Sequence, residues 1–328
     1  MPEPSFIGVD LGGTKIYTAL ADHQGKILAE IKIPTEADGG VQHVLRRIGQ
    51  TVEQVSAQAG AGVRPARLGI GAPGPTDSAR GIVHQAPNLG WREVPLKELL
   101  EEALGLPVTV ANDGNLAALG ECLYGAGQGV ADLIYVTVST GIGGGFIFDG
   151  KLYAGASFAA AEIGHMTVDP DGPLCNCGNR GCLEAVASGS AMARRARELA
   201  EAGGGQRIIQ AAGGKDKISA LSVSRAAATG DREALAILAE TGKWLGLGLA
   251  NLINLLNPAL ILLGGGAMQA GKPLWEAMER EIKERALQAS RQQVRLAPAG
   301  LGPRSGLLGA IALAIQSSAP GDRIISIS

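Results

Sequence analysis

Long apolar runs are missing from this 328-residue chain. Hydrophobic residues make up 46% of the sequence, yet no stretch approaches the roughly 20 apolar residues that a membrane-spanning helix needs. The first residues, Met1 to Pro4, also lack the basic and then apolar pattern of a signal peptide. These absences predict a globular, cytoplasmic protein without a membrane partner.

An excess of charge of one sign is also missing. The 29 Lys and Arg residues and the 31 Asp and Glu residues are well mixed and leave a net charge of −2. A protein that binds nucleic acid or an anionic membrane needs a basic face. The charge balance therefore predicts a small-molecule partner and no nucleic acid.

Cysteine is scarce, but three of the four cysteines share one polar loop with a histidine. The loop holds His165, Cys175, Cys177 and Cys182. Three thiolates and an imidazole are a ligand set that tetrahedral zinc prefers, and four protein ligands leave no open position, which is typical of a structural site. The alternative is ordinary reduced thiols, but buried structural cysteines have no reason to concentrate in a polar loop. Cys122, alone in an apolar helical pattern, is expected in the core.

Two carboxylates flank the predicted zinc ligands. Glu162 precedes His165, and Glu184 follows Cys182. A zinc ion would stiffen the loop and fix both carboxylates in space without using them as ligands. The loop is therefore predicted to carry binding or catalytic groups as well as the metal.

Glycine is abundant, at 49 of 328 residues, about twice the usual share, and it gathers at predicted strand ends. Two strand–turn–strand units stand out, with Gly-rich turns at residues 10–15 and 139–145. The first turn combines exposed backbone N–H groups with a carboxylate, a hydroxyl and an ammonium, which suits polyphosphate and Mg²⁺. The alternative is a simple hairpin turn, but the second unit makes a weak internal repeat that favours two phosphate-binding turns.

Two common nucleotide motifs are excluded. No Gly-x-x-x-x-Gly-Lys-Ser/Thr sequence occurs in the chain, so the first turn is not a Walker loop. Residues 69–74 match Gly-x-Gly-x-x-Gly, yet Pro73 and Pro75 forbid the helix that must open there to meet a dinucleotide pyrophosphate. We therefore expect no nicotinamide cofactor.

A third polar segment, Asn112-Asp113, ends a predicted strand and begins a helical pattern. One interpretation is that Asp113 is the helix N-cap, which stabilises a helix by about 1 kcal/mol. The other is that Asp113 is a general base, because ligands of α/β enzymes bind outside the carboxyl ends of strands.

Mixed elements along the chain predict an α/β protein. A loop is expected through Pro73 and Trp91, and a largely helical region from Leu183 to about Asn257. The other expected elements are strands at 6–10, 16–21, 27–33, 68–71, 108–111, 133–138, 146–148 and 259–263, and helices at 41–59, 95–104 and 305–315.

Taken together, the motifs resemble those of the ROK family of bacterial sugar kinases, closest to the glucokinases, over nearly the whole chain. The matching segments are Asp10-Leu11-Gly12-Gly13-Thr14-Lys15, Gly71-Ala72-Pro73-Gly74-Pro75, Asn88-Leu89-Gly90-Trp91, Asn112-Asp113, residues 139–145, Glu162-Ile163-Gly164-His165 and Cys175-x-Cys177-x₄-Cys182-x-Glu184. The resemblance implies an actin-like ATPase (ribonuclease H-like) fold, with two α/β domains flanking a cleft. Residues 1–112 and about 303–328 would form the small domain, and residues 113–302 the large domain with a zinc loop at 165–184.

The resemblance also implies an activity, the phosphorylation of the 6-hydroxyl of D-glucose by ATP in glycolysis, with Mg²⁺ and a structural Zn²⁺ as cofactors. Asp113 would be the general base, and His165 would bind zinc with one ring nitrogen and sugar with the other. The implied sugar ligands are Asn88, Asn112, Asp113, Glu162, His165 and Glu184. The implied nucleotide and Mg²⁺ residues are Asp10, Gly12, Gly13, Thr14, Lys15, Thr140, Gly141, Gly143, Gly264, Gly265 and Gly266, with Lys15 the least specific.

Some positions depart from the family pattern. Ala161 stands before Glu162 where members commonly have Gly, and Gly114 follows Asp113 where Ala is usual. Neither change removes a reacting group. The polar tail after Ala319 is given no role.

Several alternatives stay open. Another hexose, such as N-acetylmannosamine or fructose, and polyphosphate as donor are possible within the family. A sugar-sensing regulator is a different class, but only five residues precede the first predicted strand, which leaves no room for a helix-turn-helix. A non-catalytic, zinc-stabilised actin-like protein is a third class. The resemblance further implies a homodimer or homotetramer.

Overall fold

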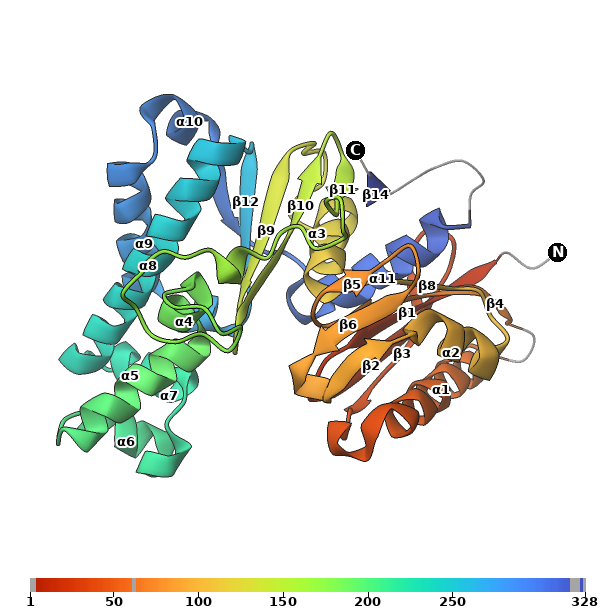
Figure 1. Ribbon diagram of the computed structural model, residues 1–328, viewed down its shortest axis with the longest axis horizontal. Helices are drawn as coiled ribbons and strands as arrows, with labels where there is room; N and C mark the ends of the chain where they lie inside the picture. The colour runs from red at the N-terminus through yellow and green to blue at the C-terminus, as the bar shows by residue number, and fades with distance from the viewer. Residues whose placement is uncertain (1–3, 61–62, 319–324, 327–328) are drawn as a thin grey trace. The chain divides into compact units, whose positions relative to one another are not determined.

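The structure, a computed structural model, describes residues 4–60, 63–318 and 325–326. The chain divides into two compact units (Figure 1). Unit 1 comprises residues 1–135, 145–161 and 299–328, and unit 2 comprises residues 136–144 and 162–298. The units are groups of residues that pack together, and they do not test the domain limits that the resemblance implies. Those limits stay a prediction.

Unit 1 is built on a five-stranded sheet with the order β3-β2-β1-β4-β8. The strands β1, β2 and β3 are antiparallel, whereas β1, β4 and β8 are parallel. In this register Asp10 lies beside Gly71, and Ala72 beside Asn112, so the carboxyl ends of the three parallel strands meet at one edge. The strands are β1 (Ser5–Leu11), β2 (Lys15–Ala21), β3 (Ile27–Pro34), β4 (Pro65–Ala72) and β8 (Val108–Asn112).

Alternating side chains of β2 divide the core of unit 1 between the two faces of the sheet. Ile16 and Leu20 belong to the cluster formed with the helices α1 (Gly40–Gln58) and α2 (Leu96–Leu104). The alternate residues Tyr17, Ala19 and Ala21 point to the other face. There they pack with apolar residues of α11 (Ser305–Gln316), which are Leu307, Leu308 and Ile311. Both faces are covered because successive strand residues point to opposite sides.

Glycine lets helix α11 lie directly on the sheet. A Cβ added at Gly8 would lie 2.5 Å from Cγ1 of Ile311, and one at Gly69 would lie 2.1 Å from the carbonyl oxygen of Ala310. Strand glycines of this kind mark a close approach of another backbone. The expected last helix is thus confirmed, and it packs with helix α3 (Asp113–Tyr124) as well as the sheet.

Two sequence expectations need correction. The expected loop through Pro73 and Trp91 contains a small antiparallel sheet of β5 (Thr76–Asp77), β6 (Ile82–Ala86) and β7 (Trp91–Val94), whose strands are too short to show a period. The second Gly-rich turn is also shorter than expected, because strand β10 (Ile142–Phe148) already begins at Ile142. Glycine is rare in strands, but a Cβ at Gly145 would lie 2.6 Å from that of Ala118 on α3, so only glycine fits there.

Unit 2 is mainly helical, as expected. Its longest helix, α8 (Arg232–Leu256), begins at the N-cap Asp231, whose side chain accepts a hydrogen bond from the backbone of Ala234. Parallel strands β12 and β13 pair beside the helices. The elements are α4 (Leu183–Ala187), α5 (Gly189–Glu201), α6 (Gln206–Ala212), α7 (Ala220–Ala228), α9 (Lys272–Arg285), α10 (Gln288–Gln293), β12 (Leu260–Gly264) and β13 (Arg295–Pro298).

Strand β9 (Leu133–Val138) has residues in both units. Strand β10 does so too, and its residues in unit 1 pair with β11 (Lys151–Tyr153). Of the tail after Ala319, only Ile325 and Ser326 are described, as the short strand β14 parallel to β11. The rest of that tail lies outside the described residues.

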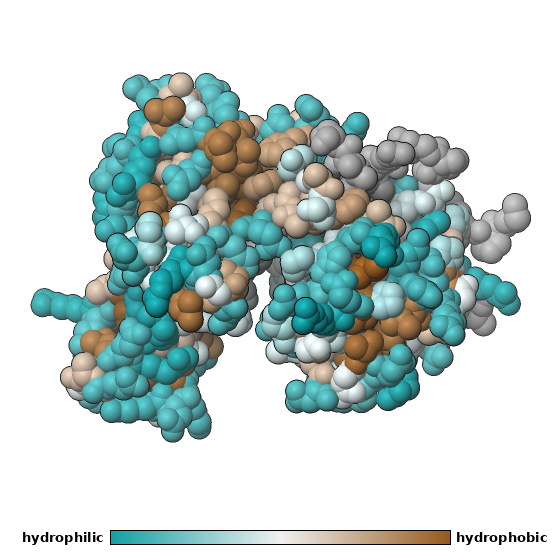
Figure 2. Space-filling model, in the orientation of Figure 1, coloured by the Kyte–Doolittle hydropathy of each residue, from teal (hydrophilic) through white to brown (hydrophobic). Residues whose placement is uncertain are grey.

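Figure 2 shows hydrophilic residues over much of the face it draws. Large apolar side chains that are well exposed are Leu28, Leu174, Leu221, Leu255 and Leu287. Within the described part of the chain, no helix combines the length and the apolar character needed to cross a membrane. Cys122 on α3 is half-buried rather than fully in the core, and its burial raises the pKa of the thiol.

One buried carboxylate joins α3 to the segment that leads into α11. Glu121 is fully buried. Its Oε2 accepts hydrogen bonds from the backbone of Ala126 and Gly300, at 3.1 and 2.9 Å. Its Oε1 accepts bonds from the backbone of Leu301 at 2.9 Å and from the hydroxyl of Ser305 at 2.8 Å. A buried carboxylate is stable only when donors compensate its lost hydration, and here four donors do so.

We expect Glu121→Gln to lower the free energy of unfolding by about 2–4 kcal/mol, because the new NH₂ group would face at least one backbone N–H donor in either orientation and leave it unsatisfied. Urea unfolding followed by circular dichroism measures this change. The matched control is Glu102→Gln on the exposed side of α2, which should change stability by less than about 0.5 kcal/mol. Equal stability of the two variants would contradict this role of Glu121.

Candidate functional site

The first Gly-rich turn follows strand β1 and is held by a threonine that the sequence analysis missed. The N–H of Gly12 donates to the carbonyl of Lys15 at 2.9 Å. The hydroxyl of Thr35 donates to the carbonyl of Gly12 at 2.6 Å, and its backbone N–H donates to Thr14 at 3.1 Å. Thr35 follows an ordinary strand pattern, so no motif marked it. These bonds fix the turn in one conformation.

Asn88 lies against this turn. A Cβ added at Gly13 would lie 2.7 Å from the Cβ of Asn88 and 2.9 Å from its carbonyl oxygen. Gly13 is therefore required for close packing, and a predicted sugar ligand and a predicted phosphate turn are neighbours within unit 1. Asn88 itself is exposed on a short 3₁₀ helix, Pro87–Leu89.

Asp10 is a largely buried carboxylate at the end of β1. Its Oδ2 lies 3.6 Å from the Nζ of Lys15, and its exposed fraction is 16%. Desolvation raises the pKa of Asp10, and the nearby Lys15 only partly opposes this effect. Helix α11 also lies close to this carboxylate, since a Cβ added at Gly306 would lie 3.1 Å from Oδ1 of Asp10. The predicted lysine is thus a counter-ion of Asp10, and a divalent cation would favour the charged carboxylate further.

The structure tests one of the two interpretations of the Asn112-Asp113 segment, the helix N-cap. Asn112 is the N-cap of α3, since its Oδ1 accepts the N–H of Asn115 at 3.1 Å, and its Nδ2 donates to the carbonyl of Gly74 at 3.1 Å. Asp113 is the first helical residue and accepts the N–H of Gly114 at 2.8 Å. The N-cap interpretation of Asp113 is therefore wrong. Helix α3 uses Asn112 for that purpose, and Asp113 is held at the carboxyl edge of the sheet.

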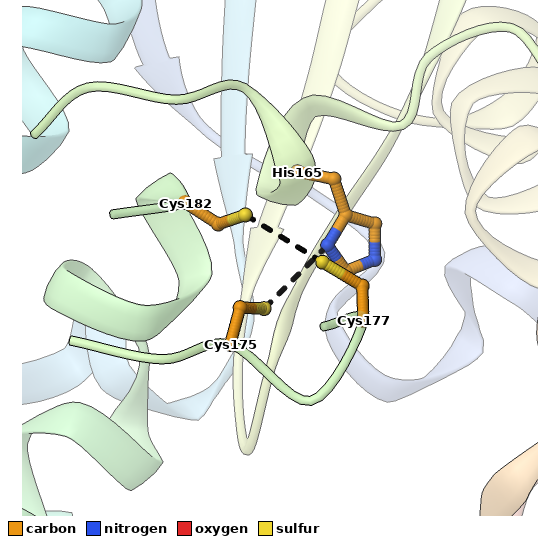
Figure 3. A group of neighbouring side chains, drawn as sticks. All are labelled: His165, Cys175, Cys177 and Cys182. Atoms are coloured by element: carbon orange, nitrogen blue, oxygen red, sulfur yellow. Dashed lines mark hydrogen bonds between the residues drawn. The ribbon is translucent and has the colours of Figure 1, made fainter. Parts of the chain in front are cut away.

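In unit 2, the side chains of His165, Cys175, Cys177 and Cys182 point toward one another (Figure 3). Their ligand atoms all lie within 4.8 Å of one another. The Sγ atoms of Cys177 and Cys182 are 3.6 Å apart, and Sγ of Cys175 is 3.8 Å from Nδ1 of His165. Tetrahedral zinc with Zn–S bonds of about 2.3 Å requires ligand atoms about 3.7 Å apart. The donor set and its spacing therefore fit zinc.

Backbone hydrogen bonds bring the distant parts of this cluster together. The N–H of Leu183 donates to the carbonyl of Met166, and that of Cys175 to Asn179, at 2.8 and 2.7 Å. Gly181 has a φ of 64°, and a Cβ there would lie 1.4 Å from the carbonyl oxygen of Asp169. No other residue fits at Gly181, so the loop conformation is encoded partly by this glycine.

The pKa values of the three thiols differ within the cluster. Burial, with the neighbouring thiols, raises the pKa of Cys182 to about 12, and burial raises the pKa of Cys175. A hydrogen bond from the backbone of Asn179 lowers the pKa of the exposed Cys177. Two buried thiolates side by side are unfavourable without a positive charge, and a bound metal deprotonates its thiol ligands outright.

His165 presents its second ring nitrogen to Glu162. While Nδ1 faces Cys175, Nε2 lies 3.9 Å from Oε2 of Glu162. A metal on Nδ1 would fix the ring and leave Nε2 for another partner. Ala161, just before Glu162, has a φ of 64°, a left-handed conformation that favours glycine. The departure from the family pattern at this position therefore adds backbone strain beside the cluster.

Glu184 joins the cysteine loop to the second Gly-rich turn. Its Oε2 accepts the N–H of Ile142 at 2.9 Å, and a Cβ at Gly141 would lie 2.2 Å from the same oxygen. The N–H groups of Gly189 and Ser190, at the start of α5, donate to the carbonyls of Ser139 and Thr140 at 2.8 and 3.2 Å. The turn is thus anchored by residues that follow the cysteine loop.

A further glycine cluster, Gly264 to Gly266, lies at the end of strand β12 in unit 2. Gly265 has a φ of 90°, and a Cβ there would lie 2.2 Å from the carbonyl oxygen of Val138. Val138 directly precedes the second turn, so two predicted nucleotide segments are neighbours in unit 2. Unit 2 therefore contains the cysteine cluster, Glu162, Glu184 and the second turn, whereas unit 1 contains Asp10 to Lys15, Asn88, Asn112 and Asp113.

The chain is similar to known proteins over most of its length. The family model described as "ROK family" matches residues 6–317. A glucokinase of Thermotoga maritima is 37% identical over 314 residues, which are 95% of this chain and 98% of that protein. A crystal structure of a ROK family glucokinase from Streptomyces griseus, in complex with glucose and AMPPNP, is 39% identical with a TM-score of 0.83, covering 95% of this chain and 99% of that one. A xylose repressor of Caldicellulosiruptor bescii is 33% identical, covering 95% of this chain and 78% of that protein.

We expect purified protein to contain about one zinc per chain and Cys177→Ser to lose it, because three ligands hold the ion much less tightly than four. The main unfolding transition should remain, since one loop of unit 2 depends on the metal. Inductively coupled plasma mass spectrometry and thermal unfolding measure both properties. Cys122→Ser is the control and should keep its zinc. Full zinc content in Cys177→Ser would contradict the assigned ligand set.

We expect Asp10→Asn to raise the thermal stability of the protein at neutral pH in the absence of Mg²⁺, since it removes a desolvated charge. Because the folded-state pKa of Asp10 is raised, the wild type regains this stability when Asp10 is protonated, and the difference should shrink as the pH falls. Thermal unfolding between pH 7 and pH 4 tests this. A variant less stable at pH 7, or a difference that grows on acidification, would contradict it.

Proposed function

The chain belongs to the ROK family, and on that premise we propose that it is an ATP-dependent glucokinase that phosphorylates the 6-hydroxyl of D-glucose. The observation that carries the proposal is the His165 cluster, which places an imidazole and two carboxylates beside a Gly-rich turn in one unit. The similarity to a glucokinase whose structure holds glucose and AMPPNP supports the same substrates here.

The sugar would be held by acceptors that match the donors of a hexose. Glu162 and Glu184 carry carboxylate oxygens, and His165 adds Nε2, so this group can accept several hydroxyl protons. Asn88 and Asn112 are further proposed sugar ligands. Desolvation raises the pKa of Glu162, with Glu184 adding to the effect and His165 opposing it. Hydroxyl donors in place of lost water would favour its charged form.

Asp113 would be the general base. As the oxygen of the sugar 6-hydroxyl attacks the γ-phosphorus, the proton of the hydroxyl would pass to the carboxylate of Asp113. The bond between the γ-phosphorus and the oxygen that bridges it to the β-phosphate would break, and ADP would leave. Base catalysis of this kind typically contributes about 10²- to 10⁴-fold. The position of Asp113, beyond the end of β8 in the first turn of α3, supports this role because ligands of α/β proteins bind at this edge.

The nucleotide would bind to backbone and side-chain groups of the Gly-rich turns. The proposed phosphate contacts are Gly12, Gly13, Thr14, Lys15, Thr140, Gly141 and Gly143. Gly264 to Gly266 would contact the nucleoside. Asp10 would hold Mg²⁺ directly or through water. Bound Mg²⁺ neutralises charge that develops on the transferred phosphoryl group.

Zinc would be structural in this proposal. Its four protein ligands leave no open position for substrate, so its contribution is to fix the His165 ring and the start of α4. Assembly into dimers or tetramers stays a prediction. Within the family, another hexose or a polyphosphate donor would use the same residues, and a substrate panel separates these possibilities.

A sugar-responsive regulator is the second candidate, favoured by the match to a xylose repressor. That protein is similar to 95% of this chain, but the balanced charge of this chain supplies no basic surface for DNA. Turnover distinguishes the two candidates, because a regulator binds sugar without consuming ATP.

We expect the protein to form glucose 6-phosphate from glucose and ATP, and Asp113→Asn to reduce kcat by about 10²- to 10⁴-fold while still binding glucose. A coupled dehydrogenase assay measures turnover over a panel of glucose, fructose, N-acetylmannosamine and mannose, with ATP or polyphosphate. Asp216→Asn, on the exposed surface of unit 2, is the control with normal activity. No turnover with glucose would contradict the proposed substrate, and normal turnover of Asp113→Asn would contradict the proposed base.

A further inference from the structure

We infer that Glu184 has a second function beyond sugar binding: it positions the second Gly-rich turn, residues 139–143, and thereby couples the affinity for sugar to the affinity for nucleotide. The inference rests on the proposed function, because it requires that the turn binds phosphate and that Glu184 binds sugar. It adds a positioning residue and a direct link between the two sites within unit 2.

The link is a contact between one carboxylate oxygen and the turn backbone. Oε2 of Glu184 accepts the N–H of Ile142 at 2.9 Å. A Cβ at Gly141 would lie 2.2 Å from the same oxygen, so the carboxylate packs directly against the Cα of Gly141. A carboxylate has about four acceptor positions on two oxygens, and one bond to the turn leaves capacity for a sugar hydroxyl.

Glu184 is held rigidly enough to transmit such a contact. It lies in α4, a five-residue helix (Leu183–Ala187) that begins at the cluster residue Cys182. Arg194 donates to the carbonyl of Ala185 at 3.1 Å, and Arg195 donates to that of Val186 at 2.6 Å. These two arginines satisfy carbonyls that a short helix leaves without partners, which fixes the helix from its C-terminal end.

The turn is anchored on the same segment from its other side. Gly189 and Ser190, which begin α5, donate their N–H groups to Ser139 and Thr140. Backbone groups therefore hold the start of the turn. The bond from Ile142, at its end, is made to a side chain that would also contact sugar. A sugar hydroxyl that donates to Glu184 shares the negative charge of this carboxylate with the N–H of Ile142. Sugar binding therefore changes the strength of the hydrogen bond from Ile142.

Thermodynamic linkage makes the coupling reciprocal. If the Glu184 contact orders the turn for phosphate, then removing Glu184 weakens nucleotide binding even without sugar. Equally, a disturbance of the turn at Gly141 weakens sugar binding even without nucleotide. A residue that only binds sugar has neither effect on the opposite ligand.

The test is isothermal calorimetry with one ligand at a time. With AMPPNP and Mg²⁺ in the absence of sugar, Glu184→Ala should bind about tenfold more weakly than the wild type. Glu184→Gln should stay within about threefold, because its amide oxygen can still accept the N–H of Ile142. Glu162→Ala, which removes the other proposed sugar carboxylate but does not contact the turn, should bind AMPPNP like the wild type.

The reciprocal measurement uses Gly141→Ala with glucose alone. The backbone of Gly141 does not have a positive φ, so alanine can adopt its conformation. The added Cβ would collide with Oε2 of Glu184 and displace this side chain. Glucose affinity should fall about tenfold although Gly141 is not a proposed sugar ligand. Zinc content and thermal unfolding of each variant identify any loss of the cysteine cluster, and Gly141→Ala still decides the matter if Glu184→Ala loses its metal.

The outcomes separate the coupling from the proposed function. If the wild type phosphorylates glucose but Glu184→Ala binds AMPPNP as tightly as Glu162→Ala does, the coupling is wrong and the function stands. Unchanged glucose affinity in Gly141→Ala would likewise overturn the coupling. If the wild type neither binds AMPPNP nor phosphorylates glucose, the proposed function itself fails.

Discussion

The site in unit 2 depends on the convergence of one imidazole nitrogen and three sulfurs at His165, Cys175, Cys177 and Cys182. Burial raises the pKa of Cys175 and Cys182, so thiolates at these two positions require a cation beside them. The zinc that we propose would offset this cost and fix two segments at once, the turn that ends at His165 and the start of α4. The carboxylates of the site lie on these two segments, and one of them reaches the second Gly-rich turn.

Unit 1 uses backbone geometry for the same purpose. Parallel strands bring the ends of β1, β4 and β8 to one edge, where Asp10 and Asp113 lie. Asn112 caps α3, and Asp113 occupies the first helical position, where its carboxylate accepts the N–H of Gly114. Helix α11 lies against the sheet through Gly8 and Gly69, and the buried Glu121 ties α11 to α3. The positions of Asp10 and Asp113 thus depend on packing contacts made by other residues of unit 1.

The sequence predicted what is coded locally. The zinc ligands, both Gly-rich turns and Asp113 stand out because residue type and spacing carry their chemistry, and most strands and helices follow from periodicity. Contacts between distant residues could not be predicted. Glu121 and Gly300 are 179 positions apart, and Glu184 and Ile142 are 42 apart, so only the folded chain shows that these carboxylates bind backbone amides. Thr35 and the strands β5 to β7 were missed because a single hydroxyl and strands of two to five residues leave no periodic signal.

X-ray absorption spectroscopy at the zinc edge tests the central claim most directly, because it reports the ligands of the metal in the protein as purified. The account predicts a first shell of three sulfurs at about 2.3 Å and one nitrogen at about 2.0–2.1 Å. Since the site is closed, addition of glucose should leave that shell unchanged. A protein without zinc, or a shell in which oxygen replaces sulfur or enters with glucose, would contradict the account.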